Sequence, residues 1–214
     1  MSKYLIAVGG ARLTRRLIQL IVGLILFGVG IGLMLQSGLG VPPWDVLHQG
    51  LATRFGLTVG IWSIIVSVVV LLLWLPLREA YGLGTLLNAV IIGVVLDLTA
   101  IVLPDADTTG AAWVMLLGGI VLIGVASGLY IGANLGPGPR DGLMTGIAKR
   151  GPSIRLTRAT IEVSVLIIGW LLGGTFGIGT IVFAVTVGPL VQFFLPRLAI
   201  SPEVQVDPWE HPAR

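Results

Sequence analysis

Two aspartates, Asp45 and Asp141, stand in the same short pattern, each two residues after a proline. An aspartate in the first turn of a helix accepts backbone N–H groups and lies at the positive end of the helix dipole, so helix capping is one interpretation. In a chain as apolar as this one, an ionisable side chain is also a hypothesis for a substrate or ion pathway. The pattern leaves both roles open, and one residue can serve both.

The residue between proline and aspartate differs in the two patterns, being Trp44 in the first and Arg140 in the second. Such a difference is how two similar segments form an asymmetric site. Arg140 has three interpretations: it holds an anion, it pairs with Asp141 or Asp45, or it is one of the basic residues that collect on the cytoplasmic side of a membrane.

Two further carboxylates, Glu162 and Asp97, lie within apolar stretches and are candidates for the same pathway. Glu162 follows Arg158 by four residues, a spacing that also predicts an ion pair on one helix face near the membrane surface. Asp97 is more isolated. It is interpreted either as a carboxylate coupled to protons or as a side chain that reaches outer water.

The residue types in the chain do not favour a catalytic site or a metal site. The chain has no cysteine, which excludes disulfides and thiolate sites, and its two histidines cannot form a metal site by themselves. Phosphate-binding loops, dinucleotide fingerprints and hydrolase motifs are absent from the sequence. We therefore expect no enzyme, no catalytic residue, no metal and no cofactor.

The composition predicts an integral membrane protein that folds as one membrane domain over residues 1–214. Hydrophobic residues make up 55% of the chain and charged residues 11%, and the mean hydropathy is +1.00. A soluble domain carries roughly 25% charged residues. The net charge of +3 then indicates cytoplasmic basic loops rather than nucleic-acid binding.

Six stretches are long enough to cross a bilayer, and the first is interpreted as an uncleaved helix rather than a signal peptide. They are Leu17–Leu35, Leu57–Leu75, Leu83–Leu103, Ala112–Leu135, Thr157–Gly173 and Gly179–Leu195. The segments Gly40–Gly56 and Gly136–Ser153 hold short helices that are too polar to span comfortably. Charge distribution places the N-terminus in the cytoplasm and fits six or eight spans nearly equally, whereas segment length favours six.

The most informative feature is an internal repeat. At an offset of 96 residues the pattern L-G-x-x-P-x-D-x-L-x-x-G recurs, and Gly82-Leu83-Gly84-Thr85 matches Gly177-Ile178-Gly179-Thr180 after a slip of one residue. The repeats cover about residues 12–104 and 112–198, and a polar tail over 199–214 is predicted to be disordered. Because each half has three spans, the second half enters the membrane from the opposite side. The fold class is therefore an all-α polytopic membrane protein with inverted repeats, each containing a short re-entrant or interfacial helix.

Four stretches together resemble the YczE/YyaS/YitT family of bacterial integral membrane proteins, and most closely its YczE-type branch. They are LGVPPWDVLHQG, LYIGANLGPGPRDGLMTG, SIRLTRATIEV and GWLLGGTFGIGT. The resemblance covers the chain from about Arg15 to Pro196. It implies this architecture and a location in the bacterial plasma membrane, and it brings no catalytic residues.

The leading hypothesis is a small transporter or permease whose site lies between the two Pro-x-Asp segments. Its partners would be the lipid bilayer and a small-molecule or ion substrate, and a homo-oligomer is left open. The alternative is a membrane scaffold or regulator that transports nothing and docks a partner on the basic loop between Arg140 and Arg158.

Overall fold

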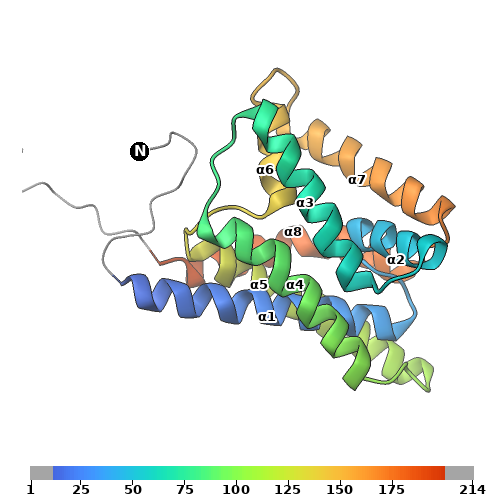
Figure 1. The fold of residues 1–214 in the computed structure, drawn as a ribbon. Helices are drawn as coiled ribbons and strands as arrows, with labels where there is room; N and C mark the ends of the chain where they lie inside the picture. Colours follow the sequence, from blue (N-terminus) through green and yellow to red (C-terminus); the bar gives the residue numbers. More distant parts are fainter. Residues whose placement is uncertain (1–11, 201–214) are drawn as a thin grey trace, which may run out of the picture.

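The computed structural model describes residues 12–200, which form eight α-helices (Figure 1). The helices are α1 (Leu13–Ser37), α2 (Pro43–Phe55), α3 (Val59–Leu77), α4 (Leu83–Val102), α5 (Thr109–Gly132), α6 (Pro139–Ala148), α7 (Ile154–Leu171) and α8 (Ile178–Leu198).

Five of these helices, α1, α3, α4, α5 and α8, are long and apolar enough to cross a membrane. Each has at least 19 residues, close to the roughly 20 that a bilayer requires. Helix α7 has 18 residues and carries Arg155, Arg158 and Glu162 in its first half, so it is long enough but less apolar. All six predicted stretches therefore coincide with helices, and five have the composition of a span.

The two short predicted helices are α2 with 13 residues and α6 with 10. At about 1.5 Å per residue they extend roughly 20 and 15 Å, against a hydrocarbon core of about 30 Å. Each begins with a proline at its first position, Pro43 or Pro139, where the missing N–H costs nothing and the fixed φ suits a helix. Neither helix is long enough to cross a bilayer.

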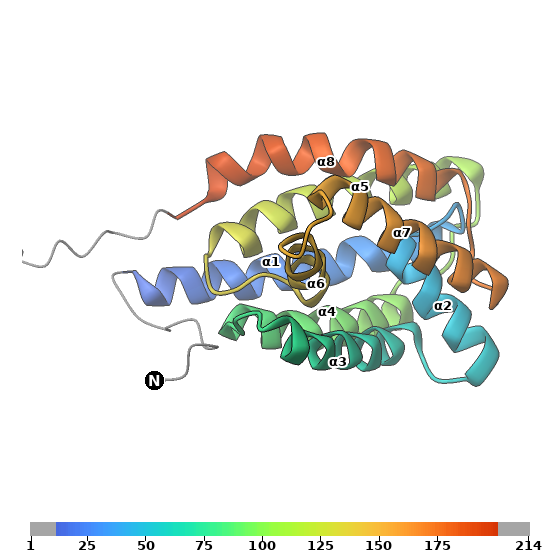
Figure 2. The ribbon, with the colours of Figure 1, turned by 90° about the horizontal axis from the view of Figure 1, so that it is seen from above.

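The helices form two layers. Contacts between neighbours order five of them in a row, α8, α5, α1, α4 and α3, with α1 at its centre (Figure 2). The short helices and α7 lie over this row: α2 packs on α7 and α3, and α6 packs on α3, α7 and α4. A space lined by side chains of both layers separates them near the middle of the molecule.

Glycines allow α1 and α5 to pack closely. A Cβ on Gly119 would lie 2.6 Å from the carbonyl oxygen of Gly30, and a Cβ on Gly23 would lie 2.8 Å from the backbone nitrogen of Tyr130. These distances are shorter than real Cβ contacts, so the two backbones approach as only small residues permit.

Other glycines of α1 and α5 pack against the next helices of the row, α4 and α8. Gly28 lies against Ile92 and Val95 of α4, and Gly124 lies against Leu190 of α8. Gly32 and Gly128, one turn further along each helix, pack on α4 and α8 in the same way.

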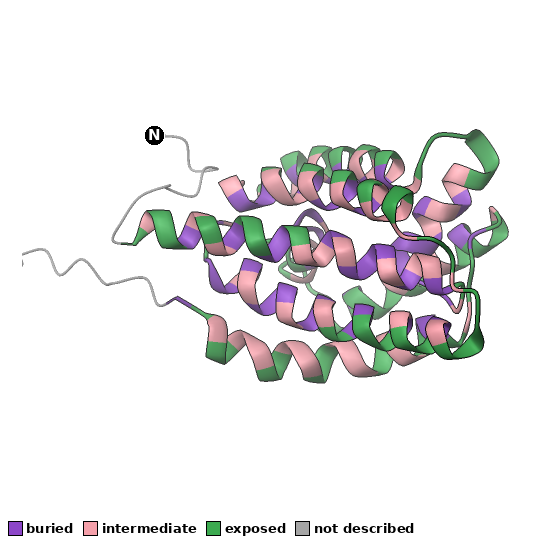
Figure 3. Cartoon of the chain, turned by 90° about the horizontal axis from the view of Figure 1, so that it is seen from below, coloured by how far each residue is buried: buried purple, intermediate pink, exposed green. Residues whose placement is uncertain are grey.

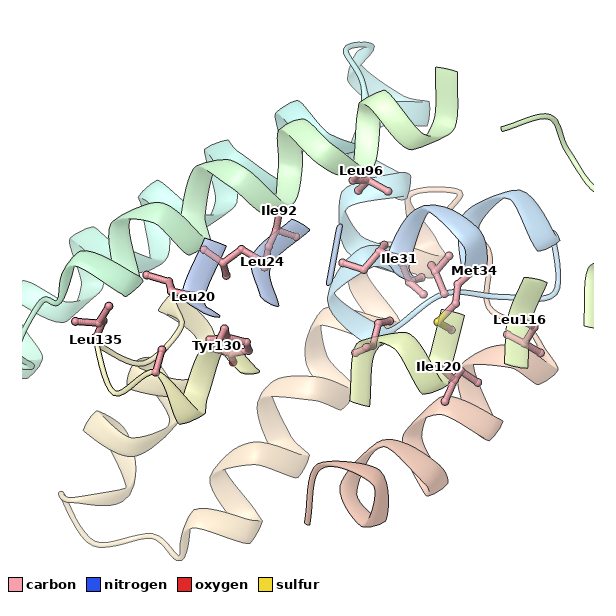
Figure 4. Close-up of a cluster of buried hydrophobic side chains, with 14 residues drawn as sticks. Leu20, Leu24, Ile31, Met34, Ile92, Leu96, Leu116, Ile120, Tyr130 and Leu135 are labelled. Atoms are coloured by element: carbon pink, nitrogen blue, oxygen red, sulfur yellow. The ribbon is translucent and has the colours of Figure 1, made fainter. Parts of the chain in front are cut away.

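Apolar side chains fill the space between the packed helices and also cover the outer surface. Leu20, Leu24 and Leu116 are fully buried in a cluster that α1, α4 and α5 share (Figure 4). Figure 3 shows exposed residues along the helices, and many exposed side chains are apolar, such as those of Val114 (73% exposed) and Leu171 (74%). A helix that is apolar on both faces is buried in protein on one side and in lipid on the other.

Helices of the second half begin 95 or 96 residues after their counterparts in the first half. The pairs of first residues are Leu13 and Thr109, Pro43 and Pro139, Val59 and Ile154, and Leu83 and Ile178. The offset is 96 for the first two pairs and 95 for the last two, which reproduces the offset and slip found in the sequence.

Both ends of the described chain differ slightly from the prediction. Helix α1 starts at Leu13 rather than Leu17, and Arg16 is buried, where its guanidinium donates to the carbonyls of Ala133 (2.8 Å) and Asn134 (2.6 Å) at the end of α5. The predicted polar tail starts too early, because Ile200 is buried and donates its N–H to Gly132 (2.9 Å). The rest of that tail, residues 201–214, lies outside the described residues.

Candidate functional site

The loop before α2 is held by the start of α8. The Thr180 hydroxyl donates to the carbonyl of Val41 (2.8 Å), and the Gly179 N–H donates to the carbonyl of Leu39 (2.8 Å). Gly40, between these two carbonyls, has φ +122°, and a Cβ there would lie 2.8 Å from Thr180 Oγ1. Only glycine fits this conformation and this distance.

The loop before α6 is held by the start of α4 in the same way. The Thr85 hydroxyl donates to the carbonyl of Pro137 (2.7 Å), and the Gly84 N–H donates to the carbonyl of Leu135 (2.7 Å). Gly136 has φ +121° and lies against Thr85. The Gly-x-Gly-Thr match in the sequence thus has a function that sequence reasoning missed: each copy anchors the loop of the other half.

These two anchors bring the N-termini of α2 and α6 together in the middle of the molecule. The Arg140 guanidinium lies 5.1 Å from the centre of the Trp44 ring, within the range of a cation–π interaction. Its Nη2 lies 3.7 Å from Asp45 Oδ1, an ion pair longer than a hydrogen bond. Of the three interpretations of Arg140, the structure supports pairing with Asp45, across 95 residues of sequence.

Asp45 is 1% exposed and has one hydrogen bond from a side chain. His48 Nδ1 lies 3.0 Å from Asp45 Oδ1, one helical turn away. Among the described residues, Asp45 Oδ2 and His48 Nε2 are the buried side-chain polar atoms that lack a hydrogen-bond partner. An unsatisfied buried polar atom costs free energy, so its presence in a native fold calls for an explanation.

Asp141 has a different partner from Asp45. The Tyr130 hydroxyl on α5 donates to Asp141 Oδ2 (2.8 Å). Neither aspartate makes the side-chain capping hydrogen bond that the sequence had suggested, and each lies in the first turn, where the positive helix end favours a carboxylate. Tyr130 and His48 had not been selected from the sequence.

Glu162 accepts a hydrogen bond from Arg158 Nε (2.9 Å), the predicted pair on one face of α7. The two side chains are 29% and 57% exposed, and both line the space between the layers. Arg158 and Glu162 therefore form the predicted ion pair and also line the cavity, so both interpretations of Glu162 stay open.

The space between the layers is a cavity of about 300 Å³. This volume is at the lower end of the range for small-molecule sites. Five of the six candidate residues line it: Trp44, Asp45, Arg140, Asp141 and Glu162. Serine, amide and aromatic side chains complete the wall, among them Phe27, Ser63, Ser67, Asn88, Ser127, Tyr130 and Gln192.

A second hollow of about 350 Å³ adjoins the cavity near the end of α5. Ile131 and Asp141 line both spaces, and Asn134, Gly136 and Pro137 complete the second. Asp141 therefore stands between the central cavity and the surface of the molecule at that end.

Asp97 lies away from this site. Its carboxylate accepts hydrogen bonds from the Thr58 hydroxyl and from the Gly60 N–H (2.8 Å), so it holds the start of α3 against α4. The two partners lie 39 and 37 residues before Asp97, at the start of α3, so the sequence around Asp97 gives no sign of these bonds.

Three carboxylates and two guanidinium groups line the cavity. Across the described part of the chain, no group of three His, Cys, Asp or Glu side chains could hold a metal. Charged groups at membrane depth interact strongly with ligands because little water screens them.

Fold and site define an all-helical, polytopic membrane protein with a charged internal cavity. The chain belongs to a family described as "Family of unknown function (DUF6198)", which matches residues 14–196. No solved structure matches the chain.

Three relatives are similar over most of their length. An "Uncharacterized protein" of Haemophilus influenzae is 42% identical over 186 residues, covering 86% of this chain and 85% of the relative. The "Uncharacterized membrane protein YczE" of Bacillus subtilis is 39% identical, covering 82% and 83%. The "Uncharacterized protein YyaS" of the same organism is 31% identical, covering 82% and 90%. These relatives confirm the family resemblance identified from the sequence.

Proposed function

We propose that this protein is a small transporter or permease of the bacterial plasma membrane, and that its substrate binds in the cavity between α2 and α6. Ligand sites between repeats, formed by interrupted helices that meet near the midplane, are typical of secondary transporters. The meeting of the two helix starts at a charged cavity of about 300 Å³ carries the proposal.

Inverted repeats account for this arrangement. In the proposed topology α1, α3, α4, α5, α7 and α8 cross the membrane, and α2 and α6 enter it from opposite sides. Two observations support it: the short helices lack the length to span, and equivalent helices begin at a nearly constant offset. Three spans in each half give the halves opposite directions.

We propose that the N-terminus is cytoplasmic. The basic residues Arg78, Lys149, Arg150 and Arg155 then lie on the cytoplasmic side, and the loop between α4 and α5, which has no basic residue, lies outside. The second hollow beside Asp141 would be the cytoplasmic approach to the site.

A transporter must expose its site to each side in turn, and this can be tested without knowing the substrate. Because the chain has no cysteine, Ser127→Cys, on the cavity wall, is a unique target for an impermeant thiol reagent. We expect labelling from outside in intact cells and from inside in inverted vesicles. Lys149→Cys should react only from inside and Asp107→Cys only from outside, which checks the topology.

Labelling of Ser127→Cys from one side alone would contradict transport and favour the scaffold hypothesis. In the structure, two basic residues of the loop on which a scaffold would dock its partner already have partners within the chain. Lys149 pairs with Glu79 (2.8 Å), and Arg150 donates to the carbonyls of Gly146 (2.7 Å) and Pro76 (2.9 Å). These contacts favour a structural use of those charges.

A further inference from the structure

Equivalent helix pairs are packed in one half and separated in the other. Helix α3 packs along α4 (Figure 2), whereas α7 and α8 make few contacts with each other. Both α7 and α8 line the central cavity, α7 through Arg158 and Glu162, and α8 through residues that include Gly188 and Gln192. The cavity is therefore bordered by two helices that do not close against each other.

Glycines show the difference at single positions. A Cβ on Gly93 of α4 would lie 2.5 Å from the carbonyl oxygen of Gly60 on α3. Gly188 of α8 is the counterpart of Gly93 at the 95-residue offset, and a Cβ there would meet no atom within 4 Å. The same glycine is in a tight helix contact in one half and borders open space in the other.

The sequence of the second half favours this opening. At the 95-residue offset that relates α3 to α7, Gly60 corresponds to Arg155, an exposed residue whose side chain cannot allow the backbone contact that glycine allows. Pro189 follows Gly188 inside α8, where it removes a helix hydrogen bond and favours a bend. Exposed apolar residues lie on both helices, among them Val163, Ile167 and Val185.

Two groups at the bottom of the opening have unused bonding capacity of opposite charge. Arg140 contacts Asp45 through one of its nitrogens, Nη2, and the Trp44 ring through its guanidinium, and its side chain is 24% exposed, so its other N–H groups can bind a ligand. Asp45 Oδ2 is buried without a partner. A guanidinium fork binds phosphate or carboxylate in two contacts, and a free carboxylate oxygen accepts from an ammonium group.

We propose that the cavity binds the headgroup of a zwitterionic amphiphile, which enters sideways from the bilayer between α7 and α8. Its anionic group, phosphate or carboxylate, lies on Arg140 and its ammonium group on Asp45 Oδ2, while its apolar chain remains between the two helices. Because Arg140 and Asp45 are adjacent, the two charges of the ligand are separated by only a few bonds. This inference depends on the proposed transport function in one respect: it takes the same cavity as the substrate site.

Sideways access can be measured with a reagent that is confined to the bilayer. Ser127→Cys protein in phosphatidylethanolamine–phosphatidylglycerol vesicles is exposed to a maleimide attached to a phospholipid headgroup, and the mass gain is recorded. We expect labelling, and we expect Gly188→Leu to abolish most of it by filling the opening. Gly118→Leu is the matched control, because Gly118 on α5 also borders open space and does not line the cavity.

Headgroup chemistry is tested by the unfolding temperature in maltoside detergent. Lysophosphatidylethanolamine should raise it more than lysophosphatidic acid, which lacks the ammonium group, and phosphoethanolamine without a chain should have no effect at the same concentration. Arg140→Gln and the Asp45→Asn, Arg140→Gln double variant should lose the increase. Equal stabilisation by free phosphoethanolamine would show a water-soluble ligand and overturn the amphiphile.

The remaining outcomes separate this proposal from the transporter itself. If Ser127→Cys reacts with soluble reagent from both sides but never with the lipid-anchored maleimide, access from the bilayer is excluded and the transporter stands. If Gly188→Cys forms a disulfide-linked dimer in the membrane and lipid labelling is absent, a second copy of the chain fills the opening, and the amphiphile is excluded.

Discussion

The contact between α1 and α5 and the contact between α2 and α6 follow opposite rules. Along α1 and α5, glycines and fully buried leucines bring the backbones together, and this region contains the main apolar cluster. Where α2 meets α6, a guanidinium, a carboxylate and an imidazole meet with two polar atoms left unpaired. The first contact is built for stability, whereas the second keeps bonding capacity that stability alone would have eliminated.

The largest effect is expected from breaking the glycine contact. Gly119→Leu places a side chain where a Cβ already lies 2.6 Å from the Gly30 carbonyl, and we expect a loss of about 3 kcal/mol or more in unfolding free energy. Gly118→Leu, one residue earlier, meets no atom within 4 Å and should behave like the parent protein. Unfolding by a denaturing detergent in mixed micelles measures both. Equal losses would show that α1 and α5 do not pack as described.

A smaller loss of unfolding free energy is expected when the ion pair between Arg140 and Asp45 is broken. Arg140→Gln leaves the buried Asp45 carboxylate with only His48, and we expect a cost of about 2 kcal/mol, below that of a fully buried pair because Arg140 is 24% exposed. Asp45→Asn combined with Arg140→Gln removes both charges and should recover most of that loss. If the double variant is as unstable as the single one, charge pairing is not what Arg140 contributes.

Removing either loop anchor should lower the unfolding free energy by the same amount. Thr85→Val and Thr180→Val each remove a hydroxyl that donates to a loop carbonyl and accepts from the N–H of the glycine at its own helix start, and we expect a loss of about 1–2 kcal/mol for each. Because the anchors belong to different loops and share no partner, the losses should add in the double variant. A large loss at one site and none at the other would contradict the equivalence of the halves.

The smallest effect is expected from exchanging Trp44 and Arg140, the residues that stand between proline and aspartate in the two segments. Trp44→Arg alone places two guanidinium groups at the meeting point, and Arg140→Trp alone removes the cation. The double exchange restores one ring and one cation, and we expect it to regain about 0.5–1 kcal/mol over the less stable single variant. No recovery would indicate that the surroundings of Trp44 and Arg140 are not interchangeable. The unfolding temperatures of the four proteins measure the comparison.

Local patterns in the sequence predicted most of the helices. Pro43 and Pro139 marked the starts of α2 and α6, and the length of the apolar runs placed the long helices within a few residues. The matched Pro-x-Asp segments also led to the prediction that their residues lie close together. Trp44, Asp45, Arg140 and Asp141 do lie on one cavity.

Contacts between distant helices were beyond the sequence. Tyr130 is one of many aromatic residues in apolar stretches, and only the course of the loop between α5 and α6 brings its hydroxyl to Asp141. Asp97 looked like an isolated charge because its partners at Thr58 and Gly60 belong to another helix. His48 could have been found, since its spacing of three residues from Asp45 places both on one face of a helix.

The crosswise anchoring of the loops has a consequence for biosynthesis. The carbonyl of Val41 obtains its hydroxyl partner from Thr180, a residue translated 139 positions later. We therefore expect the carbonyls of Leu39 and Val41 to lack these partners during synthesis until α8 has been inserted. A truncated chain lacking α8 should be degraded faster than the full chain, whereas α8 supplied as a separate polypeptide should restore its level.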